Sequence, residues 1–303
     1  MNVEIFYPNF LKKAISFTID DGNLPLDKKF IDIVKPYGIK GTFNLVGNDR
    51  MNGLTEEEYR EFYSGFEIAN HCKKHPKVIL PTDNFVISDE PFDPQTANPE
   101  LLYKTDKEGL YHKYYRSWWG FIATTDAYIE LVDEGKRELD EIFGKENVSA
   151  FVWPYHEQAD DKIKAHLKNY GYKSVRRTGE GSFEIPKDKM SWSYNAIHKD
   201  LLIRAKEYEE YPNDMLSFFC FGVHAHDFEN DKCWYILEDF VKQYGKRNNE
   251  FWYATVGEIF DYTDACDMLV ISENYITNPS EFTLYIKVEG KEVILNKNET
   301  YTV

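Results

Sequence analysis

The sequence predicts an α/β fold built around a mostly parallel sheet. Short apolar segments rich in β-branched residues alternate with segments whose apolar residues have helical spacing, as in successive βαβ units. Polar residues suited to catalysis repeatedly follow the predicted strands directly. Sites in parallel α/β folds lie at the carboxyl ends of the strands, so this placement supports the same architecture.

The N-terminal part of the chain alternates regularly. A buried strand is predicted at 14–19, and Leu26, Phe30, Ile33 and Val34 predict a helix over 25–37. The next strand is expected at 38–46, after Gly38 ends that helix. The predicted helix at 55–64 can be capped by Thr55, with Glu58 in the capping-box position. A short strand at 66–70 follows.

Residues 77–115 interrupt this alternation. They contain four prolines, few periodic apolar residues and many Asp, Lys and Tyr residues. We expect a long surface excursion there that is able to cover one edge of the site. Beyond it, helices are predicted at 118–143, 160–170 and 233–244, and strands at 148–153, 172–177, 215–223 and 251–256.

The character of the chain changes from residue 267 onward. Polar and apolar residues alternate, with turn signals at 289–290 and 296–298, which predicts a small β-hairpin appendage. A segment of this size is too short to fold alone and should pack on the main domain. The expected organisation is therefore a main domain over 1–266 and an appendage over 267–303.

The composition of the chain limits the classes of binding partner that it can have. The 303-residue chain has 36 basic and 52 acidic residues and a net charge of −16, which disfavours nucleic acid and anionic surfaces. No apolar run approaches the ~20 residues that a membrane-spanning helix needs. The first residues lack the pattern of a signal peptide. The protein is therefore either intracellular or exported with its signal removed, and the sequence does not decide between these.

Two short segments carry the chemistry. Asp20 and Asp21 end the first predicted strand, and His71 and His75 follow the strand at 66–70. Alone, the acidic pair is often only a turn, and a His-x-x-x-His pair is often a surface accident. Two adjacent acids at a buried strand end need a cation or a proton to neutralise one of them. The histidine spacing places both imidazoles on one face of a helical turn, so Asp21 and both histidines are candidate ligands of a zinc-type cation.

The chain resembles the polysaccharide deacetylases, the NodB-like catalytic domain of carbohydrate esterase family four, over about residues 12–265. The family motifs TFDDG and H-[ST]-x-x-H-P correspond to TIDDG at 18–22 and HCKKHP at 71–76. Only Ile19 and Cys72 depart from these two motifs. The family fold is a distorted (β/α) barrel, often with seven strands, and this is the fold that the resemblance implies.

The resemblance also implies roles for these residues. Asp20 corresponds to the catalytic base, and Asp21, His71 and His75 correspond to the metal ligands. The implied cofactor is a divalent metal, with Zn²⁺ expected first, although Co²⁺, Ni²⁺ and Fe²⁺ tolerate the same ligand set.

The third family motif, R-x-P-[FY], is only half present. Val152 stands at the arginine position, followed by Pro154 and Tyr155. In the family that arginine orients the base, and the backbone N–H of Tyr155 would help to hold the oxyanion. Some branches carry an arginine at the end of the next strand instead. Arg176 and Arg177 are both available there, and we favour Arg177.

The last family motif is a strand that ends in a histidine, the general acid. The strand at 215–223 is followed by His224 and His226. The order of residues after the strand favours His226 as the acid, with His224 as the second choice. The expected lining of the sugar site is Trp153, Pro154, Trp192 and His224, although core packing is the ordinary role of a tryptophan. Among the remaining histidines, His156 is the one expected to reach the pocket.

The resulting hypothesis is a metal-dependent hydrolase that removes N- or O-linked acetyl groups from an acetylated glycan or oligosaccharide. Two alternatives remain open. The same superfamily includes hydrolases of small amides and cyclic ureides, and Val152 together with the 77–115 excursion would allow such a reshaped pocket. Val152 also fits a carbohydrate-binding protein that kept the fold and lost the chemistry.

Overall fold

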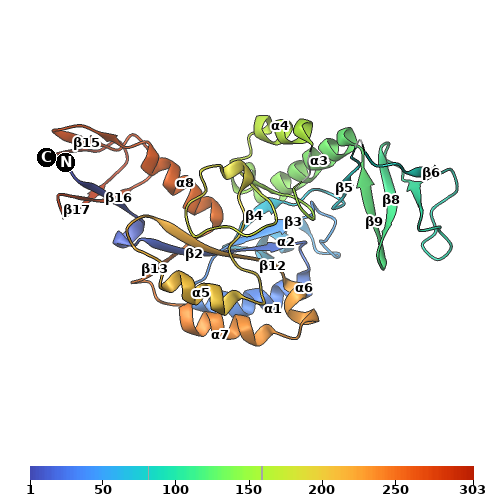
Figure 1. Cartoon of the computed structure of the whole chain (residues 1–303), viewed down its shortest axis with the longest axis horizontal. Coiled ribbons are helices and arrows are strands. Elements are labelled where there is room, and N and C mark those ends of the chain that lie inside the picture. Colours follow the sequence, from blue (N-terminus) through green and yellow to red (C-terminus); the bar gives the residue numbers. More distant parts are fainter. Residues whose placement is uncertain (81, 158–159) are drawn as a thin grey trace.

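The computed structural model describes residues 1–80, 82–157 and 160–303. A parallel sheet forms its centre, and helices lie around that sheet (Figure 1). Within the described residues this sheet has seven strands, β2 (Lys13–Asp20), β3 (Thr42–Leu45), β4 (Glu67–Asn70), β10 (Ala150–Val152), β11 (Ser174–Arg176), β12 (Ser217–His224) and β13 (Phe251–Tyr253). All of these strands were predicted, with boundaries that differ by a few residues.

The sheet curls into a distorted barrel. Its order is β11-β10-β4-β3-β2-β12, and residues 192–196 bridge the gap between the two end strands. Trp192 forms a parallel bridge to Arg176 of β11, and Ala196 forms one to Phe221 of β12. One edge of β2 pairs with β12 throughout, so β13 and β3 share its other edge. The expected distorted (β/α) barrel is confirmed.

Most connections between barrel strands contain a helix. These helices are α1 (Leu24–Val34), α2 (Glu56–Phe62), α3 (Thr125–Phe143), α4 (Asp161–Tyr170) and α5 (Leu201–Glu209), with α6 (Ala225–Asn230), α7 (Trp234–Tyr244) and α8 (Val256–Asp267) following β12 and β13. Short 3-10 turns occur at Pro8–Phe10, Lys35–Tyr37, Lys145–Asn147 and Lys189–Ser191. None of the helices described here is both long enough and apolar enough to cross a membrane.

Local sequence signals explain where several elements begin. The capping box predicted for α2 is present: the Glu58 backbone N–H donates to Thr55 Oγ1, and the Thr55 N–H donates to the Glu58 carboxylate. Thr255 and Glu258 form a second capping box, so α8 begins where the strand predicted at 251–256 was expected to continue. Neither α5 nor α8 was predicted.

The segment expected to be a long excursion folds as a sheet. It contains β5 (Lys77–Val78), β6 (Val86–Ser88), β7 (Leu101–Lys104), β8 (Leu110–Tyr115) and β9 (Trp118–Ala123), in the order β5-β9-β8-β7-β6. This inserted sheet projects from one side of the barrel (Figure 1). The helix predicted at 118–143 was therefore wrong for its first residues, which form β9. The strands escaped prediction because much of the segment is exposed and lacks a regular apolar alternation.

The C-terminal segment folds into two small sheets. Its strands are β14 (Val270–Ile271), β15 (Tyr275–Thr277), β16 (Leu284–Val288), β17 (Lys291–Leu295) and β18 (Thr300–Thr302). The predicted hairpin joins β16 to β17 through Glu289 and Gly290, which both have positive φ, as a tight hairpin turn requires. The N-terminal strand β1 (Val3–Phe6) pairs with β16, so both chain ends lie together (Figure 1).

Candidate active site

The two adjacent aspartates lie at the carboxyl end of β2. Asp20 is the last strand residue, and Asp21 and Gly22 both have positive φ. The chain is held in this turn by a hydrogen bond from the Asp21 N–H to the Asn44 carbonyl, 3.0 Å long. A Cβ atom on Gly22 would lie 3.0 Å from the Leu45 side chain, so a glycine suits this position. The turn sends the two carboxylates in different directions.

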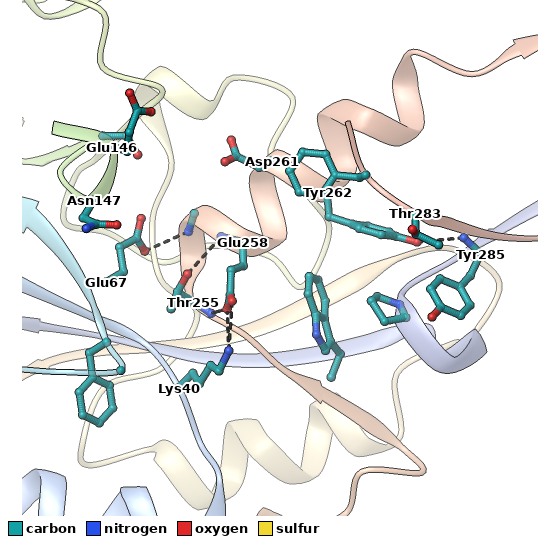
Figure 2. A pocket seen from close by; sticks show the side chains of 17 residues that line it. Lys40, Glu67, Glu146, Asn147, Thr255, Glu258, Asp261, Tyr262, Thr283 and Tyr285 are labelled. Carbon is teal, nitrogen blue, oxygen red and sulfur yellow. Dashed lines mark hydrogen bonds and ion pairs between the residues drawn. The ribbon is translucent and has the colours of Figure 1, made fainter. Parts of the chain in front are cut away.

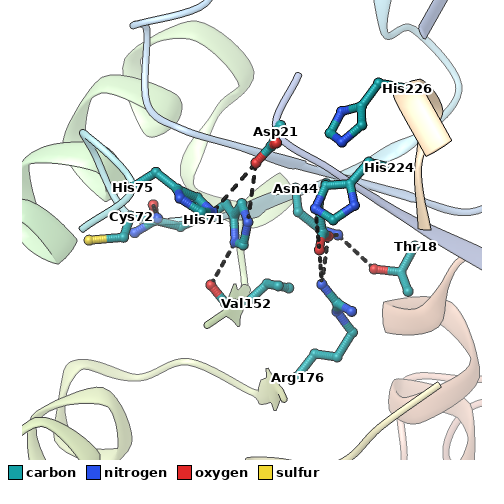
Figure 3. A network of polar contacts seen from close by, with 12 residues as sticks. Thr18, Asp21, Asn44, His71, Cys72, His75, Val152, Arg176, His224 and His226 are labelled. Carbon is teal, nitrogen blue, oxygen red and sulfur yellow. Dashed lines mark hydrogen bonds and ion pairs between the residues drawn. The ribbon is translucent and has the colours of Figure 1, made fainter. Parts of the chain in front are cut away.

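Asp21, His71 and His75 converge on one point (Figure 3). Asp21 Oδ1 lies 3.6 Å from His71 Nε2 and 3.5 Å from His75 Nε2. All three atoms are buried, and none has a hydrogen-bond partner among the described residues. Ligand atoms about 2.1 Å from a tetrahedral zinc ion are roughly 3.4 Å apart, so the spacing fits such a cation. Buried polar atoms without partners are costly, and a shared cation would satisfy all three.

The surroundings also suit the histidines to metal binding. His71 Nδ1 lies 2.9 Å from the Val152 carbonyl, and donation by that N–H leaves the Nε2 lone pair facing Asp21. Burial lowers the pKa of His71, and burial together with the neighbouring His71 lowers the pKa of His75 to about 3. Both imidazoles are therefore neutral near pH 7, as metal ligands must be.

The histidine segment is not the helical turn that the spacing predicted. Cys72, Lys74 and His75 all have positive φ, and the Asn70 carboxamide oxygen accepts from the Cys72 N–H. This irregular turn directly follows β4. The prediction failed because a His-x-x-x-His spacing is compatible with a helical turn but does not require one.

Asp20 is held by a buried arginine. Arg176 Nη2 donates to both Asp20 carboxylate oxygens, at 2.5 and 2.6 Å, and Asn44 Nδ2 donates to one of them at 2.6 Å. Burial opposes ionisation, but the charge of Arg176 holds the pKa of Asp20 well below its usual range. Asp20 is thus an ionised carboxylate that is not part of the three-ligand group.

The arginine beside Asp20 is not the one that we favoured. Arg177 lies 3.8 Å from Glu157 and donates to the Thr178 carbonyl, whereas Arg176 is only 1% exposed. Successive residues of a strand point to opposite sides, so only one of the two can face the barrel interior. The prediction of Arg177 was therefore wrong, and Arg176 replaces it.

Of the two candidate acids, His224 lies nearer to Asp20. His224 Nε2 is 4.0 Å from Asp20 Oδ2, and its Nδ1 is 2.9 Å from Asp227 Oδ2. His226 lies in the first turn of α6, where its ring stacks on that of His224. Burial acts to lower the pKa of His224, but the hydrogen bond to Asp227 and the charges of Asp20, Asp21 and Asp227 raise it to about 9. Of these two histidines, His224 is therefore the one that contacts Asp20.

These groups open into one cleft of about 860 Å³. The ring of Tyr155 lies beside His75, with ring centroids 4.6 Å apart. His156 lines the cleft, as expected, and so does His198, which contacts Asp231. The inserted sheet contributes Trp118, Trp119 and Phe121 to the lining of the cleft. Arg50 comes from the loop after β3, and Thr178 and Tyr194 come from the segment between β11 and β12.

Three of the four residues expected to line the sugar site do not line the cleft, whereas His224 does. Trp153 and Trp192 are 3% and 4% exposed and pack in hydrophobic clusters, and Pro154 is also buried. None of these three residues lines the cleft. The prediction was wrong because side-chain direction at a strand end cannot be deduced from composition. The adjacent pair Trp118–Trp119 was the available signal, but its segment was assigned to a helix.

A second cavity, of about 680 Å³, lies at the opposite ends of the barrel strands (Figure 2). Three of its acidic residues, Glu67, Glu258 and Asp261, already have partners. Glu67 accepts hydrogen bonds from Thr42 Oγ1 and the Gly257 N–H, and Glu258 pairs with Lys40. The described part of this cavity therefore offers no converging set of unpaired ligands like that around Asp21.

Comparison with known proteins gives a family and matches to several solved structures. The profile of the polysaccharide deacetylase family matches residues 8–175, whereas no curated protein matches the chain. The carbohydrate esterase domain of a multidomain xylanase from the hindgut metagenome of Trinervitermes trinervoides is 14% identical, with a TM-score of 0.48, and the match covers 84% of this chain and 92% of that one. A peptidoglycan deacetylase from Bacillus subtilis is 15% identical, with a TM-score of 0.44 and coverages of 86% and 97%. A pseudoenzyme of carbohydrate esterase family four from Bacillus anthracis is 12% identical, with a TM-score of 0.42 and coverages of 85% and 68%.

Proposed function

Because this chain belongs to the polysaccharide deacetylase family, we propose that it is a metal-dependent hydrolase that removes acetyl groups from an acetylated carbohydrate. One observation carries the proposal. Three buried ligand atoms, which have no hydrogen-bond partner within the described part of the chain, converge in the cleft next to an aspartate that Arg176 keeps ionised. A protein that only bound carbohydrate would have no physical need for this costly arrangement.

Asp21, His71 and His75 would hold the cation. When bound, a divalent cation polarises an acyl carbonyl and lowers the pKa of a coordinated water. Asp20 is the base in this proposal, because it is ionised, lines the same cleft and is not needed as a ligand. Arg176 and Asn44 fix its orientation through the hydrogen bonds described above.

In this proposal, Tyr155 binds the oxyanion and His224 is the general acid. The Tyr155 backbone N–H is assigned to the oxyanion of the tetrahedral intermediate, as the family resemblance implies, and the ring of this residue contacts His75. His224 donates a proton to the departing amine or alkoxide. Asp227 holds the imidazole of His224 through Nδ1 and leaves Nε2 directed toward Asp20.

The function is tested by measuring hydrolysis with and without a chelator. Acetate release from acetylated xylan and N-acetylchitooligosaccharides, and ring opening of small cyclic amides, would be assayed in parallel with zinc-loaded protein. We expect acetate from at least one acetylated glycan, and its loss on chelation and return on metal addition. Hydrolysis of the cyclic amides alone would instead favour the small-amide alternative, and activity that is indifferent to the chelator would contradict the proposal.

His224→Ala should lower kcat/KM by about 10²–10⁴-fold, the range typical of a general acid. His226→Ala is the matched control and should lose far less, because its ring stacks on that of His224 and only His224 of the two has a recorded contact with Asp20. A larger loss in His226→Ala than in His224→Ala would reverse the assignment.

The raised pKa of His224 means that its acid form is present below about pH 9 and is lost above it. The rate of the wild-type protein should therefore fall as the pH rises through about 9.

A further inference from the structure

Three buried polar atoms inside the barrel have no hydrogen-bond partner among residues 1–80, 82–157 and 160–303. They are Arg176 Nε, Trp192 Nε1 and Asn44 Oδ1, and each of the three residues is at most 4% exposed. All three residues line one small cavity of about 10 Å³ within the barrel. Buried polar groups are nearly always hydrogen-bonded, so these three atoms call for a shared partner.

The pairing of Arg176 with Asp20 uses a single nitrogen of the guanidinium group. Nη2 donates to both carboxylate oxygens, whereas an arginine fork commonly presents two nitrogens to a carboxylate in parallel. Contact through one nitrogen fixes the distance between the two groups but not the plane of the guanidinium. The ring of Tyr194, whose centroid lies 5.3 Å from Arg176 Cζ, limits movement on one side only. A partner for Nε would fix that plane.

Trp192 and Asn44 are placed to complete the bonding of Arg176. Trp192 pairs with Arg176 in a parallel β-bridge, so the two side chains leave the sheet on the same side. Asn44 Nδ2 donates to Thr18 Oγ1 at 2.7 Å and to Asp20 Oδ1 at 2.6 Å, which uses both amide hydrogens and leaves Oδ1 as an acceptor (Figure 3). The residues around the cavity thus offer two N–H donors and one carbonyl acceptor. A polar cavity of about 10–15 Å³ can hold one water molecule, which typically makes about three hydrogen bonds.

We propose that one ordered water molecule in this cavity accepts hydrogen bonds from Arg176 Nε and Trp192 Nε1 and donates one to Asn44 Oδ1. Through this water Trp192 is a positioning residue for Asp20, because it fixes the guanidinium plane that holds the carboxylate. A bridging water is nearly as favourable in enthalpy as a direct hydrogen bond, so it can serve this purpose. The effect on the rate rests on the proposed function, whereas the water and its contacts do not.

Two replacements of Trp192 separate its N–H group from the packing of its ring. 3-Benzothienylalanine keeps the bicyclic shape and has sulfur in place of Nε1–H, whereas Trp192→Phe also removes ring volume that packs against Phe260. The control carries the same analogue at Trp252 of β13, which lines the second cavity, at the opposite ends of the barrel strands. High-resolution crystal structures, kcat, KM and metal content would be determined for the zinc-loaded full chain in each case.

The wild-type structure should show a water molecule within hydrogen-bond distance of both Arg176 Nε and Trp192 Nε1. The analogue at Trp192 should turn the guanidinium plane of Arg176 and lower kcat about three- to tenfold, with KM and metal content unchanged. Trp192→Phe should lose at least as much, and the analogue at Trp252 should match the wild type. The inference fails if no water contacts both nitrogens, if the analogue at Trp192 keeps the wild-type kcat, or if the analogue at Trp252 loses as much.

The structures decide alone if the wild type releases acetate from no acetylated glycan. A water in contact with both nitrogens, together with a turned Arg176 guanidinium in the analogue at Trp192, would then uphold the inference and contradict the proposed function. An Arg176 that keeps its wild-type orientation in that analogue would overturn the inference instead.

Discussion

The His71→Ala variant is expected to lose its bound metal and its hydrolytic activity together. His71 supplies one of three buried ligand atoms, and the two that remain would bind a divalent cation much more weakly. Loss of a partner outside the first coordination shell already costs about 10–100-fold in affinity or activity, so loss of a ligand should exceed 100-fold. Metal content after dialysis and acetate release from the best substrate are the two measurements.

His166→Ala provides the matched control. His166 contacts Asp133, and neither residue lines the cleft. Its removal should leave one metal ion per chain and unchanged activity. If His71→Ala kept both its metal and its rate, the assignment of the ligand group would be wrong.

Replacing Arg176 with Met should lower the free energy of unfolding far more than replacing Arg177 with Met. The substitution leaves the buried Asp20 carboxylate without its charge partner, and removing one member of a buried pair costs about 3–5 kcal/mol. Arg177→Met should change the free energy of unfolding by only about 0.5 kcal/mol, because its contacts lie at a partly exposed position. Denaturant titration of the two variants measures the difference, and similar values for both would contradict the pairing.

The difference in the free energy of unfolding between the wild type and Arg176→Met should become smaller as the pH falls. The pKa of Asp20 is lower in the folded protein than in the unfolded chain, so ionised Asp20 contributes stability above its unfolded pKa. That contribution is lost as the pH falls through the folded pKa. The gap between wild type and Arg176→Met should therefore be full near pH 7 and narrow in acid. The double variant Asp20→Asn/Arg176→Met, which removes both charges, should recover part of the lost stability.

The barrel was predictable because the sequence patterns that mark its strands and helices are local. β2 is an unbroken buried run, α1 and α2 have helical spacing, and the Thr55 capping box marks a helix start. The convergence of Asp21 with His71 and His75 follows from the order of the strands in the sheet, since the neighbouring parallel strands β2, β3 and β4 end on one side of it.

The remainder depends on side-chain direction and on contacts distant in sequence. The choice of Arg176 over Arg177 is decided by which residue at the end of β11 faces Asp20, and a one-residue shift exchanges them. Trp192 was expected at the site but lies in the segment that closes the barrel, and its ring packs against Phe260 of α8. The inserted sheet is held by pairing between short, partly exposed strands, and a single sequence gives little sign of such pairing.

The most direct test of the metal-site proposal is a crystal structure of the zinc-loaded protein, with anomalous scattering recorded at the zinc edge. The account predicts one strong peak within bonding distance of Asp21 Oδ1, His71 Nε2 and His75 Nε2, with Asp20 still bound to Arg176. His224, His226 and Asp227 form a second group able to hold an ion. A sole peak at that group, or direct ligation by Asp20, would contradict the account.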